Sequence, residues 1–487
     1  MRQLPIGRVA AIAAIAVLSV AAVPSVSAGR LAFSVWLRLG AYELAGFSMD
    51  GMDSRYIGAQ GRLGLEYAAA PGLTLFATAG RRGPSGYDGP LSRRYLTAQY
   101  GRVHRFTGGQ WWPRVESAGI DWRVTGNIWA QAGMIKPLET GLISVDQKFA
   151  NFGLSGGAAF PRGFVRFHWD KPDLNNRWDL GEKTDGELFF EGDDTRADFL
   201  QGVAGANGRR WSVTAGLSAL IDRTPPDRRV AWFGQQINRD VLGLATVAGT
   251  WRCPLLDLRT EYARNFGRAS GPMAEMRHEG WFVQAEGRFR GLWVEPGFRV
   301  IRATGQQMSK VGYFSGRPEI STNRAFSVYS PANLLLFDTR YPIFVGPYIM
   351  TGSGYALNYG IMRPGLFGDP HVPENLRANA LTVDINRGAR FTAQIAWWRM
   401  ETDVPAVGMR GGAVINLPRD LGEEWNVYAR YQVTPSCSVN IIGGVLELGD
   451  YYRAKRDDLN PYWIFPLPPD QSSERMYQLE IGWEWML

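Results

Sequence analysis

The sequence is poor in the residues that carry most metal and redox chemistry. It has two cysteines and four histidines among 487 residues, and their spacing matches no metal site or haem-attachment motif. We therefore expect no cofactor. Lysine is also scarce, because six of the 53 basic residues are lysine and the rest are arginine. A GC-rich genome would produce this bias, but arginine also binds carboxylates and phosphates through a planar fork.

Long apolar stretches are missing beyond the N-terminus. Arg2 and Arg8 precede an apolar run at 9–23, and Val26-Ser27-Ala28 resembles a cleavage site. This pattern predicts a secretory signal peptide over residues 1–28. No later stretch reaches about 18 consecutive apolar residues, which a membrane helix needs. The net charge is +7, but a secreted chain without a continuous basic block is not expected to bind nucleic acid.

Aromatic residues are abundant, at 13% of the chain, and the last twelve residues show how they are used. Side chains alternate between the two faces of a strand. One face of this segment carries Tyr477, Leu479, Ile481, Trp483, Trp485 and Leu487. An aromatic-rich apolar face predicts the closing strand of an outer-membrane β-barrel, with that face against lipid. The alternative is the edge strand of a soluble sandwich or solenoid in the periplasm.

Short turns and longer polar stretches alternate along the chain. Eight turns join pairs of alternating segments, at 70–72, 125–127, 161–163, 207–208, 253–254, 290–291, 387–388 and 434–436. The longer stretches are 81–112, 137–150, 170–197, 221–240, 267–279, 303–376, 400–422 and 448–474. This pattern is typical of an antiparallel up-and-down transmembrane barrel with periplasmic turns and external loops.

The turns also predict the number of strands. Eight hairpins and one strand at each end give about 18 strands in one domain over residues 29–487. A further hairpin near Tyr341-Pro342 would give about twenty. The predicted location is the outer membrane of a Gram-negative bacterium.

The polar face of each strand should line the lumen. By alternation it carries ten arginines and ten acidic residues, so charge alone does not make the lumen positive. We expect an arginine track for an anionic solute at Arg123, Arg259, Arg288, Arg290, Arg299, Arg390 and Arg430. Arginine is longer than aspartate or glutamate, so its charge reaches further toward the axis. The alternative is a structural charge ladder, in which Asp257, Glu261, Glu286 and Glu295 neutralise their neighbours.

Three other features have more than one interpretation. The acidic stretch 170–198 is either a solvated outer loop, a gate or a calcium site. His168 and Asp170 form a possible acid–base pair, but no nucleophile is evident, so we expect no enzymatic activity. Cys253 and Cys437 either pair in the periplasm or stay as separate thiols near turns.

Residues 240–487 resemble the alginate-export family of outer-membrane barrels. The matching motifs are Glu261-Tyr262, Phe266-Gly267-Arg268, Gly280-Trp281, Ala303-Thr304-Gly305, Phe337–Pro342, Leu421–Glu424 and Gly449-Asp450. Gln306, Ile343–Gly346 and Asn426 depart from the family pattern. The resemblance implies an 18-stranded porin that exports an anionic polysaccharide and works with periplasmic secretion partners. A general or solute-specific porin, and a sleeve around a partner such as an electron carrier, are the alternatives.

Overall fold

A computed structural model gives the fold of most of the chain. It describes residues 30–45, 54–81, 114–138, 140, 151–171, 197–223, 238–271, 275–291, 293–305, 322–324, 326, 375–388, 390–405, 407–410, 413–456 and 474–486. The predicted signal peptide at 1–28 and the turn expected near Tyr341-Pro342 lie outside these residues.

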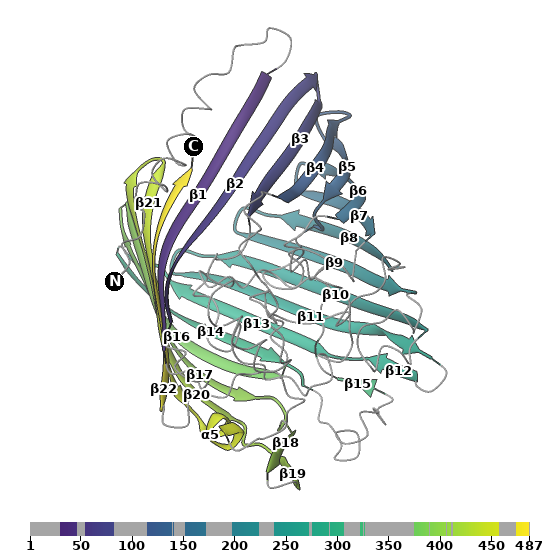
Figure 1. Cartoon of the computed structure of the whole chain (residues 1–487). Coiled ribbons are helices and arrows are strands. Elements are labelled where there is room, and N and C mark those ends of the chain that lie inside the picture. Colours follow the sequence, from purple (N-terminus) through teal and green to yellow (C-terminus); the bar gives the residue numbers. More distant parts are fainter. Residues whose placement is uncertain are drawn as a thin grey trace, which may run out of the picture.

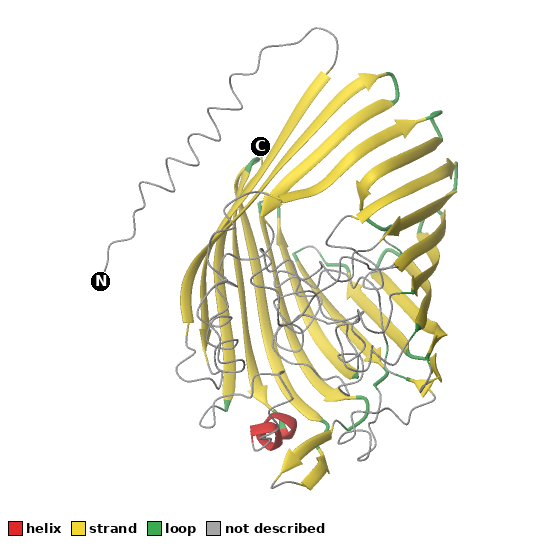
Figure 2. Ribbon diagram, turned by 45° about the vertical axis from the view of Figure 1, so that its right-hand side comes forward, coloured by secondary structure: helices red, strands yellow, loops and turns green. Residues whose placement is uncertain are grey.

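Eighteen antiparallel strands form a closed ring, as the turn pattern predicts (Figures 1 and 2). The strands are β1 (Arg30–Ala45), β2 (Ser54–Ala70), β3 (Leu73–Arg81), β4 (Arg114–Arg123), β5 (Ile128–Ile135), β6 (Asn151–Phe160), β7 (Gly163–Lys171), β8 (Ala197–Asn207), β9 (Trp211–Asp222), β10 (Arg239–Arg252), β11 (Leu256–Ser270), β13 (Trp281–Phe289), β14 (Val294–Ala303), β16 (Leu376–Arg387), β17 (Phe391–Thr402), β20 (Asp420–Thr434), β21 (Cys437–Leu448) and β22 (Arg475–Met486).

The eight predicted turns all connect neighbouring strands. The first of them shows why: Pro71 and Gly72 link β2 to β3, and Gly72 has a φ of 78°. Glycine adopts this left-handed conformation without the steric cost that other residues pay. The segment 303–376 adds no strand to the ring, because Ala303 of β14 pairs directly with Leu376 of β16. The ring therefore closes with 18 strands, not twenty.

The ring closes where the first strand meets the last. β1 pairs with β22 from Trp36↔Met486 to Ala45↔Tyr477 (Figure 1). On the inner face, the Trp36 indole Nε1 donates to Glu484 Oε1 at 2.5 Å, and Asn440 Nδ2 donates to Glu484 Oε2 at 3.3 Å. Glu484 therefore ties β1, β21 and β22 together across the closure.

Smaller elements lie at the long-loop end of the barrel. β12 (Glu275–His278) pairs with β11 and, in parallel, with the short β15 (Thr322–Asn323). β18 (Val407–Arg410) and β19 (Ala413–Asn416) form a separate hairpin. The helix α5 (Asp450–Arg456) follows β21 (Figure 2). None of the helices in the described part of the chain is long and apolar enough to cross a membrane.

A belt of exposed apolar side chains surrounds the ring. Leu381 is 60% exposed, Leu217 58% and Trp425 51%, whereas Trp398, Phe282 and Leu220 face inward and are buried. A closed antiparallel barrel with an apolar outer surface has no unpaired strand edge and can sit in lipid. The alternative of a soluble sandwich or solenoid is therefore wrong.

One bulge bends β20 at the long-loop end. The register shifts between Met400 and Glu401 of β17, so that Leu421 is the extra residue. Gly422 next to it has a φ of 103°, and a Cβ at this position would lie 2.0 Å from Glu447 O. Only glycine fits this bulge, which accounts for part of the Leu421–Glu424 motif.

Candidate solute pathway in the barrel lumen

The inner wall is lined by the polar face of each strand. On β11, β13 and β14 the inward residues are Asp257, Arg259 and Glu261, then Glu286 and Arg288, then Glu295 and Arg299. The register places these side chains in rows, because Arg259 lies opposite Glu286 and Glu286 lies opposite Arg299.

Three of the seven arginines expected to form the track are paired with acids. Arg290 donates through Nη2 to Asp257 Oδ1 at 2.6 Å, and Arg288 lies 3.4 Å from both Asp257 Oδ2 and Glu295 Oε2. Arg299 Nη2 lies 3.6 Å from Glu286 Oε1. The hydrogen bond to Asp257 raises the pKa of Arg290, which stands in the turn after β13, so this guanidinium stays charged.

The remaining predicted arginines have no ion pair within the described ranges. They are Arg123, Arg259, Arg390 and Arg430. Arg123 and Arg390 are exposed at the short-turn end, while Arg259 is half-buried. Arg430 lies inward on β20 between Thr392 and Asn440, and its Nε is buried with no hydrogen-bond partner there.

Several acids of the inner wall are held by neutral donors. Gln131 Nε2 donates to Asp121 Oδ2 at 3.0 Å, and the Gln394 amide donates to Asp384. Glu484 accepts from Trp36 and Asn440, as described above. These carboxylates are kept against the wall. Glu66, which is exposed, is an exception.

Residues 136–138 and 140, which follow β5, lie against the inner wall. Gln201 of β8 clamps the backbone of Leu138: its Oε1 accepts from Leu138 N at 2.8 Å and its Nε2 donates to Leu138 O at 2.6 Å. Thr140 is buried, and a Cβ added to Gly216 of β9 would lie 2.5 Å from its Cγ2. The glycine therefore makes room for this segment inside the barrel.

A second segment reaches the inner wall from the stretch between β14 and β16. The Phe326 ring is fully buried and stacks on Phe282 of β13, with ring centroids 5.2 Å apart. Phe326 N also donates to Thr304 O at 2.9 Å. Because Phe282 is an inward residue, Phe326 lies on the lumen side of the wall. Phe326, Leu138 and Thr140 therefore occupy part of the space inside the barrel.

A serine joins the histidine–aspartate pair at 168 and 170. His168 Nε2 lies 2.9 Å from Asp170 Oδ2, and Ser155 Oγ of β6 lies 2.5 Å from His168 Nδ1. His168 and Asp170 are fully buried and Ser155 is 5% exposed, so this group lies within the wall. A second buried pair links His278 Nε2 to Asp240 Oδ1 at 2.9 Å, and the sequence analysis did not predict it.

The two cysteines and the acidic stretch are the remaining features that the sequence analysis singled out. Cys253 and Cys437 are separate free thiols, and Cys253 Sγ accepts from Leu256 N at 3.2 Å. Most of the acidic stretch 170–198 lies outside the described residues. Within the described ranges, no group of three or more histidine, cysteine, aspartate or glutamate side chains has the geometry to hold a metal ion.

Solved structures with a similar fold come from Pseudomonas aeruginosa. The outer-membrane protein OpdK is 11% identical, with 94% of this chain and 99% of OpdK covered and a TM-score of 0.50. OccK3 (OpdO) is 12% identical over 94% of this chain and 95% of its own, and OpdL is 10% identical over 95% and 99%, both with a TM-score of 0.50. These are outer-membrane porins, and the likeness shows that this chain has the porin fold. The belt and the fold together make it an outer-membrane barrel.

Comparison with protein-family models and with curated proteins finds no match. The resemblance to the alginate-export family is therefore not confirmed. Its hairpin motifs do lie where expected, since Leu421–Glu424 and Gly449-Asp450 bracket the β20–β21 hairpin. Phe337–Pro342 lies outside the described residues.

Proposed function

We propose that this porin passes small solutes and prefers anions. The observation that carries the proposal is that acidic and basic side chains of the inner wall differ in how they are held. The carboxylates of Asp121, Asp384 and Glu484 are held to the wall by neutral donors, whereas Arg123 and Arg390 extend exposed guanidinium groups without a counter-ion in the described ranges. Guanidinium groups exposed at one mouth of the barrel attract anions toward the lumen.

The two inward segments favour small solutes over a polymer. A polysaccharide chain or a sleeved partner protein needs a continuous wide bore. Here Leu138 is clamped to β8 and Phe326 is packed on β13, so both segments occupy lumen space. Export of an anionic polysaccharide, with secretion partners, remains the competing hypothesis. The proposal includes no catalytic role, because Ser155, His168 and Asp170 are buried in the wall.

Two variants with opposite expected effects on ion selectivity test whether the charges at 257–295 act on passing ions. Arg288→Ala with Arg290→Ala removes the ion-pair partners of Asp257 and Glu295, so we expect the ion selectivity to shift a few-fold toward cations. Asp257→Asn releases Arg290 and leaves Arg288 paired with Glu295 alone, so we expect a smaller shift toward anions. Reversal potentials in planar bilayers across a salt gradient measure both shifts.

Folding is checked first with a heat-modifiability gel, because removing one partner of a partly buried ion pair leaves the other charge without its counter-ion. Folded variants that both keep the wild-type reversal potential would show that these charges lie off the ion path. Two shifts in the same direction would contradict the placement of the pairs.

A further inference from the structure

Charged residues also occupy the outer face of the wall, at the long-loop end of β14, β16, β17 and β20. Alternation places Arg302 on the same face as Phe298 and Val300, and Arg399 on the same face as Ile395 and Trp397. No register shift interrupts β14–β16 or the β16–β17 pairing at these positions. These arginines therefore point away from the lumen.

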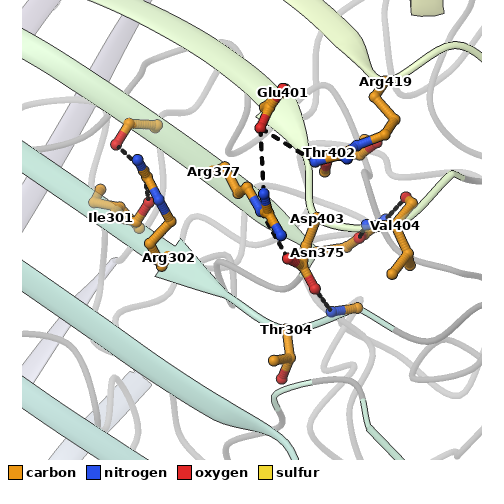
Figure 3. A network of polar contacts seen from close by, with 12 residues as sticks. Ile301, Arg302, Thr304, Asn375, Arg377, Glu401, Thr402, Asp403, Val404 and Arg419 are labelled. Carbon is orange, nitrogen blue, oxygen red and sulfur yellow. Dashed lines mark hydrogen bonds and ion pairs between the residues drawn. The ribbon is translucent and has the colours of Figure 1, made fainter.

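Among the acids near this surface, Glu401 and Asp403 are bonded to other arginines (Figure 3), and Glu423 Oε2 accepts from Trp397 Nε1 at 3.2 Å. Arg377 Nε donates to Asp403 Oδ1 at 2.8 Å, and Asp403 Oδ2 accepts from Gly305 N at 3.3 Å. Arg419 Nη2 donates to Glu401 Oε1 at 3.1 Å and its Nε donates to Thr402 O at 2.8 Å. This network fixes the ends of β14, β16 and β17 in place.

Arg302 is held by neutral acceptors alone. Its Nη1 donates to Ile301 O at 2.7 Å and to Ala378 O at 2.9 Å, and its Nη2 donates to Asn379 Oδ1 at 2.8 Å (Figure 3). Asn379 is the cross-strand partner of Arg399, so the two arginines flank one amide. Neither has an ion pair with a carboxylate in the described ranges. Glu423 is the other cross-strand partner of Arg399, so Arg302, Arg399 and Glu423 together leave a net positive charge on the outer face.

The adjacent aromatic residues fix the depth of these charges in the membrane. Trp397 and Trp425 are cross-strand partners on the outer face, with ring centroids 6.2 Å apart. Aromatic girdles mark the edge of the hydrocarbon layer. Arg399 lies two residues beyond Trp397, a rise of about 6–7 Å along the strand. The polar headgroup layer on each side of a bilayer is about 5–8 Å thick, so Arg399 lies within it.

We propose that Arg302 and Arg399 bind a phosphate group of a glycolipid in the outer leaflet. Arginine binds phosphate through two parallel hydrogen bonds, and its fixed geometry here lowers the entropy lost on binding. Leu381, Trp397 and Trp425 form an apolar surface beside the site that the acyl chains would cover. A free anion would gain nothing from this surface, so the occupant is a lipid.

Native mass spectrometry of the detergent-solubilised protein tests the proposal. The probe is a diphosphorylated, multiply acylated glucosamine disaccharide, and its dephosphorylated counterpart is the matched ligand. We expect the wild type to retain the phosphorylated probe, and Arg302→Gln with Arg399→Gln to reduce its occupancy about tenfold, a change of about 1.4 kcal/mol. Arg475→Gln is the control, because Arg475 on the same rim already pairs with Glu447 at 2.7 Å. This variant should bind like the wild type.

Arg302→Lys with Arg399→Lys keeps the charge, and we expect partial retention of the probe. Only variants that pass a heat-modifiability gel as folded barrels are compared. Equal occupancy by the dephosphorylated lipid would overturn phosphate recognition. Displacement of the lipid by an equal concentration of inorganic phosphate would make this a free-anion site and overturn the lipid assignment. Unchanged occupancy in the folded glutamine variant would overturn the proposal itself.

Discussion

Ile481→Arg is expected to prevent most of the protein molecules from inserting into the membrane. Ile481 lies near the middle of β22, between Ile441 and Ala41 on the neighbouring strands. It shares the outer face with Leu479 and Trp483, which are both 41% exposed. A charged side chain on the lipid face near mid-membrane costs roughly 2–4 kcal/mol. We expect this cost to be enough to impair closure of the ring between β22 and β1.

The measurement is the heat-modifiable fraction in isolated membranes. Thr74→Arg is the matched control, because Thr74 faces the lumen opposite Asp121 and the new charge would meet a carboxylate. The control should insert at the wild-type level. Normal insertion of Ile481→Arg would mean that the outer face of β22 is assigned incorrectly.

Releasing both inward segments is expected to enlarge the bore. Gln201→Ala removes the clamp on Leu138, and Phe326→Ala removes the ring that stacks on Phe282. Together they should raise the single-channel conductance several-fold, since each contact holds a separate segment against the wall. Each single variant should give a smaller increase.

Phe152→Ala is the control for this conductance experiment. Phe152 is 69% exposed on the outside of the barrel, so its loss should leave the conductance unchanged. A double variant that folds and conducts like the wild type would show that neither segment limits the flow of ions.

The wall of the barrel could be predicted because its determinants are local. A turn such as Pro71-Gly72 and the alternation of side chains on each strand are visible in short windows of sequence. The inward segments could not be predicted in this way. Leu138 is held by a side chain 63 residues away, and the polar stretch at 137–150 has no periodicity that indicates which way it folds.

Cross-strand partners can be predicted from the sequence for some strand pairs and not for others. The two-residue turn at Pro161 and Arg162 pairs Phe160 with Gly163, and this register alone places Ser155 opposite His168. Counting back from the turn would therefore have found the serine. The ion pair of Arg288 with Asp257 depends on the β11–β13 register, and alternation alone could not provide it.

The alginate-export resemblance rested on short motifs whose structural causes are general. Gly422 is required by a bulge, and Gly449 follows the end of β21 in the same hairpin. Such requirements recur in barrels with different cargo. The porin fold follows from the structure, and the identity of the solute depends on the lumen.

Swelling of proteoliposomes in solutions of matched solutes tests the central claim most directly. The solutes are a neutral hexose, the corresponding uronic acid, the corresponding amino sugar and an acidic oligosaccharide built from that uronic acid. We predict that the uronic acid enters fastest, the hexose next and the amino sugar slowest, and that the oligosaccharide is excluded. Entry of the oligosaccharide at a rate comparable to the uronic acid, or faster entry of the amino sugar, would contradict an anion-preferring porin for small solutes.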